Sequence, residues 1–275
     1  MPGLPGEPRA PISTIDTLDA RTNTMKRFLK EAACLMALLL AAAAQAGTLR
    51  IAVAANFIGP LQQLSAAFER DSGTKLLLVP GATRGLYAQI RNGAPFDILL
   101  AADQETPQRL AREGLALPDS EFTYAVGKLA LWSARSGYVD ADGRVLGRGD
   151  FAHLAIANPD TAPYGAAALS VITKLGLQAR LRPRLVEGED ISQTYQFVAS
   201  GNAELGFIAL SSLYRNGKLT RSGSLWRVPD GLYRPIRQDA VILAHAKDKP
   251  AARALMAYLK SASARTIIQS YGYGF

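Results

Sequence analysis

The sequence repeatedly follows a short apolar run with a polar turn and an amphipathic segment. In the first case, the apolar run of residues 49–55 ends at Asn56. Gly59-Pro60 then opens a segment whose apolar residues have the i, i+3, i+7 spacing of one helix face, at Leu61, Leu64 and Phe68. Proline is tolerated in a first helical turn, because its missing N–H would have no helical partner. The pattern predicts a strand, a turn and a helix in that order.

The same junction recurs three more times along the chain. Thr83 follows the apolar run 75–79, and Tyr164 follows the run 154–157. Ile191 follows the short run 185–186, where Asp190 or Ser192 can cap the next helix. The helix after Tyr164 is expected to bury one side, consisting of Leu169, Ile172 and Leu175. Strands that alternate with helices in this way predict an α/β protein with mostly parallel sheets.

Four turns of this kind suggest a common ligand site. In open α/β sheets, ligands bind beyond the carboxyl ends of the strands. A helix N-terminus offers unpaired N–H groups and the positive end of a dipole, which favour an anion. The turns carry Asn56, Thr83, Tyr164 and either Ile191 or Ser192 at their tips. They predict either a site for a desolvated oxyanion or, as the alternative, four ordinary capped helices.

Composition excludes several other functions. The formal net charge is +8, but lysine and arginine are scattered without a long basic run, which indicates a generally basic protein rather than a nucleic-acid-binding one. The only histidines are His153 and His245, and no nucleophile, phosphate-loop or metal-ligand motif is present in the sequence. We therefore predict that the chain is not an enzyme.

Two further segments allow both a functional and a structural interpretation. The acidic residues Glu187, Glu189 and Asp190 can flank a metal ion, but such a run is more often a solvated loop with a helix-capping aspartate. The aromatic residues of segment 271–275 can form a binding face, but a docked C-terminus is the simpler interpretation.

Residues 1–46 have the features of an exported precursor. A polar, proline-rich stretch precedes Met25, which we expect to be the true start, and a basic segment and an apolar run follow it. Ala44-Gln45-Ala46 is a small-x-small cleavage site, so residues 1–46 are predicted to be a leader and signal peptide that is cleaved after Ala46. The only cysteine, Cys34, lies in this part. A cysteine-free mature chain is compatible with a bacterial periplasm.

An ordered set of short motifs adds a family resemblance. The motifs are Val53-Ala-Ala-Asn-Phe57, Gly93-Ala-Pro-Phe-Asp97 with Ala101-Ala-Asp103, Ala157-Asn-Pro159 with Ala162-Pro-Tyr-Gly165, Glu187-Gly-Glu-Asp190, and Gly201-Asn-Ala-Glu-Leu-Gly206. Each motif is weak alone, but together and in this order they resemble the periplasmic molybdate-binding proteins of ABC importers. The resemblance runs over residues 49–275, which is essentially the whole mature chain.

The resemblance implies the type II periplasmic-binding-protein fold. In that fold, two α/β lobes, each a mostly parallel sheet flanked by helices, enclose a tetrahedral oxyanion in the cleft between them. Residues 47–127 plus 233–275 would form lobe 1, and residues 128–232 would form lobe 2. The crossovers between the lobes would lie in residues 122–132 and 232–244.

The resemblance also implies a ligand set. By motif position, the first-strand ligand falls on Asn56 and the second hydroxyl ligand on Thr83, while the backbone donors fall on Tyr164 and Ile191. No metal cation site and no cofactor are expected, since the ligand itself is molybdate, and tungstate as well. Some relatives place a ligand tyrosine where this chain has Ala209, so one hydrogen bond must be lost or replaced, with the Tyr164 hydroxyl as the candidate.

The expected function is therefore capture rather than catalysis. The resemblance implies a periplasmic, monomeric solute-binding protein that delivers molybdate to an inner-membrane ABC permease and binds no nucleic acid. The alternatives within the binding class are another tetrahedral oxyanion such as sulfate, or a ferric complex. A ligand-sensing module is a further alternative, and an enzyme built on the same fold is the last.

Overall fold

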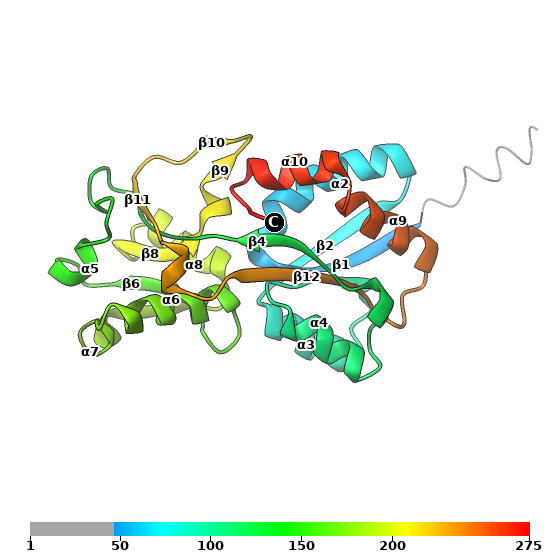
Figure 1. Cartoon of the computed structure of the whole chain (residues 1–275), viewed down its shortest axis with the longest axis horizontal. Helices are drawn as coiled ribbons and strands as arrows, with labels where there is room; N and C mark the ends of the chain where they lie inside the picture. Colours follow the sequence, from blue (N-terminus) through cyan, green and yellow to red (C-terminus); the bar gives the residue numbers. More distant parts are fainter. Residues whose placement is uncertain (1–46) are drawn as a thin grey trace, which may run out of the picture. The chain divides into compact units, whose positions relative to one another are not determined.

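The structure, a computed structural model, describes residues 47–275 (Figure 1). The predicted leader and signal peptide, including the start at Met25 and the cleavage after Ala46, lie outside the described residues. No helix within residues 47–275 combines the length and the apolar character needed to cross a membrane.

The first sheet contains five strands in the order β2-β1-β3-β12-β4. β1 pairs in parallel with both β2 and β3, whereas β12 pairs antiparallel with β3 and β4. Four strands therefore run in one direction, and β12 alone runs against them. The strands are β1 (Thr48–Ala54), β2 (Lys75–Gly81), β3 (Ile98–Leu100), β4 (Phe122–Gly127) and β12 (Ile236–Ile242).

The second sheet repeats this plan in the order β11-β5-β8-β6-β7. β6 pairs in parallel with β7 and β8, and β5 is the strand that runs against the others. The strands are β5 (Leu129–Ser133), β6 (Leu154–Ala157), β7 (Leu185–Gly188), β8 (Leu205–Ala209) and β11 (Ser224–Arg227). A small hairpin of β9 (Tyr214–Arg215) and β10 (Lys218–Leu219) lies apart from both sheets.

Helices cover both faces of the first sheet. α2 (Ile58–Ser72), α9 (Lys249–Leu259) and α10 (Ala262–Ser270) pack into one apolar core with β1, while α3 (Thr83–Arg91) and α4 (Glu105–Arg112) pack on the opposite face (Figure 1). The predicted stripe of α2 is confirmed, because Leu61, Leu64 and Phe68 are all buried. α2 begins at Ile58, so Pro60 lies within its first turn, where it removes no helical hydrogen bond.

The second sheet is also covered on both faces. α6 (Pro163–Lys174), with the short helices α5 (Val145–Arg148) and α7 (Gln178–Leu181), packs into the larger core, and α8 (Ile191–Ala199) packs on the other face. The buried side of α6 differs from the expectation at its end. Val171 and Ile172 are buried, but Leu175, which we expected to be buried, is 39% exposed because it follows the last helical turn.

Two chain segments connect the sheets. β4 of the first sheet is followed, after Lys128 alone, by β5 of the second, and β11 leads back to β12. Both segments lie where the crossovers were expected, and Figure 1 shows β4 and β12 passing side by side, as their pairing requires. Two sheets with separate helices confirm the two-lobed α/β fold. The division of the chain at residues 127/128 and 232/233 stays a prediction.

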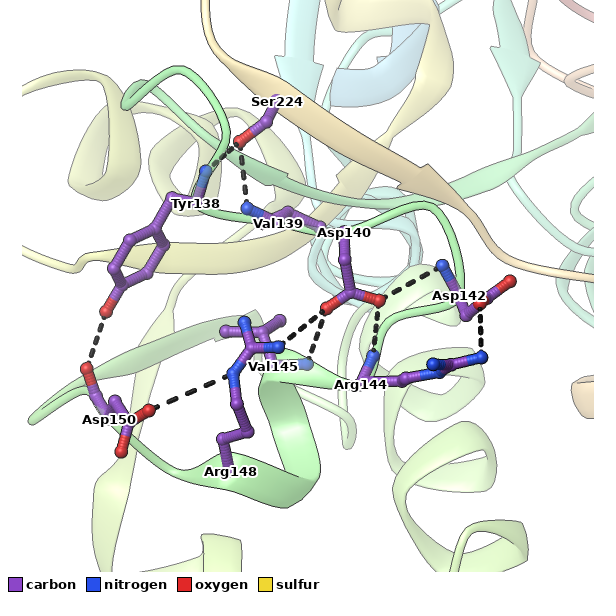
Figure 2. Close-up of polar contacts among 9 residues, drawn as sticks. All are labelled: Tyr138, Val139, Asp140, Asp142, Arg144, Val145, Arg148, Asp150 and Ser224. Atoms are coloured by element: carbon purple, nitrogen blue, oxygen red, sulfur yellow. Dashed lines mark hydrogen bonds and ion pairs between the residues drawn. The ribbon is translucent and has the colours of Figure 1, made fainter.

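The polar excursion between β5 and β6 is organised by one carboxylate, as Figure 2 shows. Asp140 accepts the N–H groups of Asp142, Arg144 and Val145 at 2.9–3.1 Å and pairs with Arg148. Burial alone would raise the pKa of Asp140, but these backbone bonds outweigh it and lower the pKa below its ordinary value. The carboxylate is thus used to fix the start of α5.

Candidate functional site

The four residues predicted for the site lie where strands of the two sheets give way to helices. Asn56 lies in a short 3₁₀ turn, η1 (Ala55–Phe57), directly after β1, and Thr83 is the first residue of α3. Tyr164 lies in the first turn of α6, and Ile191 is the first residue of α8. All four are at most 5% exposed.

Hydrogen bonds link the four turns to one another. The start of α3 contacts the turn before α6, that turn contacts the end of β7, and the start of α8 contacts η1. These bonds are Arg84 N–H to the Thr161 carbonyl (3.1 Å), Asn158 N–H to the Gly188 carbonyl (2.8 Å), and the Ser192 hydroxyl to the Ala55 carbonyl (3.3 Å). One apolar cluster also joins Ala55, Tyr164 and Ile191. The structure therefore brings the four predicted residues to one region between the sheets.

Thr83 keeps a hydroxyl proton available for a ligand. Its Oγ1 accepts the N–H of Ala102 at 3.0 Å, so the oxygen is already used as an acceptor. Within residues 47–275, no protein acceptor is found for the proton of this buried hydroxyl. The Thr83 hydroxyl proton consequently has no partner among these residues.

At the starts of three helices, a backbone N–H group likewise has no protein acceptor among the described residues. The first N–H groups of a helix have no partner within it and need one outside. At α8, the Asp190 carboxylate accepts the N–H groups of Ser192 and Gln193 at 2.8 and 2.9 Å. For the N–H groups of Thr83, Tyr164 and Ile191, no acceptor from a loop, a cap or a side chain is found in the described part of the chain. Buried donors without acceptors suit an anion.

Asn56 is in the expected place, but its side chain is already engaged. Its amide donates one hydrogen bond to Gln238 Oε1 and one to the Tyr273 hydroxyl, both at 2.9 Å. An amide has two N–H protons, so the Asn56 side chain reaches an anion only by exchanging one of these bonds.

Two buried residues of this region, Gln238 and Tyr273, were missed as site residues. Gln238, on β12, is fully buried, and its amide donates to the Tyr164 hydroxyl at 3.2 Å. The available signal was the polar run Arg237-Gln238-Asp239, which directly precedes the apolar end of this strand. The C-terminal segment with Tyr273 docks as expected, since Gly274 and Val126 exchange two backbone hydrogen bonds of 2.8 Å.

The tyrosines of the site stay neutral. Burial raises the pKa of Tyr164 and of Tyr273 well above the ordinary tyrosine value. Both hydroxyls therefore keep their protons at any physiological pH. The Tyr164 hydroxyl accepts from Gln238 at 3.2 Å and also forms a hydrogen bond with Tyr273 that lowers the Tyr273 pKa against the effect of burial. Its role as a replacement for the tyrosine absent at Ala209 stays a prediction.

Surface hollows reach the region from two directions. One of about 550 Å³ is lined by Arg84, Ala102, Ala162, Arg234 and Arg237, among others. Another of about 500 Å³ is lined by Asn56, Ser192, Ser211 and Tyr271, among others. The first hollow is lined by three arginines and by the acidic residues Asp103 and Glu105, so its charged lining is only slightly basic.

The acidic run before α8 has the structural role given by the simpler interpretation. Asp190 caps α8, and the Glu189 N–H donates to the side chain of Gln193. No group of three or more metal-ligating side chains occurs among residues 47–275. The Asp190 carboxylate of this run is thus used as the cap of α8.

Comparisons with known proteins identify the relatives of this chain. The molybdate-binding protein ModA of Azotobacter vinelandii is 58% identical over 236 residues, which cover 86% of this chain and 93% of that protein. ModA of Rhodobacter capsulatus is 47% identical over 234 residues, which cover 85% of this chain and 91% of that protein. The solved periplasmic molybdate-binding protein of Azotobacter vinelandii superposes with a TM-score of 0.80 at 41% identity, covering 82% of this chain and 99% of that one.

These relatives are named for binding rather than for catalysis, in agreement with the prediction that the chain is not an enzyme. The family described as bacterial extracellular solute-binding protein matches residues 49–274, nearly all of the described structure. The chain belongs to this family of bacterial extracellular solute-binding proteins.

Proposed function

We propose that this protein is a periplasmic solute-binding protein of an ABC importer that captures molybdate between its two lobes. The observation that carries the proposal is the set of buried donors without protein acceptors, formed by the Thr83 hydroxyl and the N–H groups of Thr83, Tyr164 and Ile191. The names of the relatives at 58% and 47% identity support molybdate as the ligand.

In this proposal, neutral donors hold a doubly charged anion. The N–H groups of Tyr164 and Ile191 and the hydroxyl of Thr83 replace the water that the anion loses on entry. The positive ends of α3, α6 and α8 offset its charge, so no arginine or lysine is required in the site. Asn56 joins the ligand set by exchanging its amide bond to Gln238, and it keeps the bond to Tyr273.

The same donors provide selectivity. A site that offers donors alone disfavours a protonated oxyanion, whose own O–H would be buried without an acceptor. Phosphate is protonated near neutral pH and is rejected on this ground, whereas sulfate must be rejected by size. Tungstate has nearly the size of molybdate and the same charge, so we expect it to bind as well.

The proposal also covers the delivery of the ligand and the oligomeric state of the protein. The protein acts as a monomer whose lobes close by hinge bending at the two crossovers, and the closed form is passed to an inner-membrane permease. Lobe 1 comprises residues 47–127 plus 233–275, and lobe 2 comprises residues 128–232. No cofactor and no nucleic acid take part.

Thermal unfolding of the chain from Gly47 in the presence of each of four anions tests the proposal. A ligand at about 100 times its dissociation constant adds roughly 2.7 kcal/mol of stability. We expect molybdate and tungstate to raise the midpoint, and sulfate and phosphate to leave it unchanged. A shift of the midpoint with sulfate alone would be consistent with the fold but would identify sulfate, and not molybdate, as the ligand. No shift with any of the four would refute the proposed function.

A further inference from the structure

The C-terminal segment after α10 packs into the region between the sheets. Gly274 pairs with Val126 of β4, and the carbonyl of Ser270 accepts the N–H of Gly217 at 2.8 Å. These contacts bring Tyr273 to a buried position, where its ring packs edge-on against Phe57 with centroids 5.5 Å apart. The last turn of the chain thereby adds a hydroxyl beside the candidate site.

The Tyr273 hydroxyl connects elements of both lobes. It donates to the backbone carbonyl of Asn56 at 2.7 Å and accepts from the Asn56 side-chain amide at 2.9 Å. It also lies 3.0 Å from the hydroxyl of Ser211, in the turn η4 (Leu210–Ser212) that follows β8 of the second sheet. The Ser211 hydroxyl in turn donates to the same Asn56 carbonyl at 3.0 Å. A residue that follows the first sheet's β1, a residue that follows the second sheet's β8 and the C-terminal segment thus share one small hydrogen-bonded cluster.

The proton inventory of this cluster fixes the orientation of Asn56. The Asn56 backbone carbonyl accepts the Ser211 hydroxyl proton at 3.0 Å. The single Tyr273 proton is shared between that carbonyl at 2.7 Å and the Ser211 oxygen at 3.0 Å, and the second of these contacts joins the two lobes. The Asn56 side-chain amide gives one proton to Tyr273 and one to Gln238. Tyr273 is the partner that binds both ends of Asn56. Burial keeps Tyr273 protonated, so this arrangement does not change with pH in the physiological range.

We propose that Tyr273 is a positioning residue of the oxyanion site, which sets Asn56 for the ligand and ties η4 of the second lobe to η1 of the first when the cleft is closed. The inference rests on the proposed function, since it assigns a role within that site. The hydroxyl touches no ligand itself in this account. It favours the closed, binding-competent form by holding both sides of the cleft together.

The proposed role of Tyr273 has a consequence for the rate at which the anion is released. A bond that exists only between closed lobes slows release of the anion more than it speeds capture, since capture begins in the open form. A residue that merely supports folding would lower the stability of the free protein and leave the release rate unchanged. The release rate therefore separates the two roles.

The test compares Tyr273→Phe with Tyr258→Phe, a control on α9. The Tyr258 ring packs against Phe68 with centroids 5.6 Å apart and is not part of the cluster. We expect Y273F to weaken molybdate binding about tenfold, mostly through faster release in stopped-flow exchange against tungstate. Y258F should stay within twofold of the unmodified protein. A change of less than threefold in Y273F, or an equal change in Y258F, would overturn the inference.

Ser211→Ala provides the second variant, because it removes the partner hydroxyl from the other lobe without touching the C-terminal segment. It should also speed release at least threefold, and an unchanged rate would count against the inference even if Y273F failed to fold. Binding of molybdate by the unmodified protein is measured first. Absence of that binding refutes the proposed function, whereas normal binding with unaffected variants refutes only the role of Tyr273.

Discussion

Replacing Thr83 by valine tests the site most simply, since it keeps the branched shape and removes one buried hydroxyl. That hydroxyl accepts the Ala102 N–H at 3.0 Å and has its proton left for the anion. A hydrogen bond to a charged group contributes about 1.5–3 kcal/mol. The dissociation constant of T83V for molybdate should therefore rise roughly 10- to 150-fold. The orphaned Ala102 N–H should also lower the free energy of unfolding of the unliganded protein by about 1–3 kcal/mol.

Titration calorimetry on the chain from Gly47 measures the first effect, and urea unfolding without ligand measures the second. Thr83→Ser is the control, because it restores the hydroxyl and loses only a methyl group. T83S should bind molybdate within a few-fold of the unmodified protein. Unchanged affinity in a folded T83V would remove Thr83 from the site and refute the reasoning from available donors.

Three further predictions concern the scaffold. Gly165→Ala places a Cβ 2.1 Å from the Ala157 carbonyl oxygen, so it should lower the free energy of unfolding by about 1–3 kcal/mol in a urea titration. Gly85→Ala is the control, because its Cβ would have no atom within 4 Å, and it should leave the free energy of unfolding unchanged or raise it slightly. Asp190→Ala removes the α8 cap and should cost about 0.5–2 kcal/mol in that assay, and a D190N variant that lost as much would argue against capping as the cause. Burial raises the pKa of Tyr124, Tyr164 and Tyr273, so above pH about 10 the unfolded chain releases protons that the folded chain retains. Stability should fall as pH rises from there by up to about 1.4 kcal/mol per pH unit for each tyrosine, and a flat profile from pH 9 to 11 would contradict this burial.

The local parts of the fold could be predicted because they follow from local patterns. Each apolar run and its following turn lie within some fifteen residues, so periodicity and capping residues such as Asp190 determine them. The end of α6 shows the limit of such a pattern. Leu175 continues the apolar spacing but follows the last residue of the helix, and the chain turns away before it is buried.

The hydrogen-bonded part of the site could not be predicted in the same way. Asn56 bonds to Gln238 and Tyr273, which lie 182 and 217 positions further along the chain. Only the pairing of β12 with β3 and β4 and the docking of the C-terminal segment bring these residues together. A buried polar side chain such as that of Gln238 needs a partner, but the sequence does not indicate which one. The engagement of both Asn56 amide protons was for that reason invisible in the sequence.

In the proposed complex, helix N-termini and one threonine hydroxyl hold a bare oxyanion between the lobes. The decisive experiment is a crystal of the chain from Gly47, grown with molybdate and measured at the molybdenum absorption edge. We expect one strong anomalous peak, with ligand oxygens about 2.7–3.1 Å from the Thr83 hydroxyl and from the N–H groups of Tyr164 and Ile191. A peak beside the exposed arginines Arg84, Arg234 and Arg237 instead, with the three donors bonded elsewhere, would contradict the proposed complex.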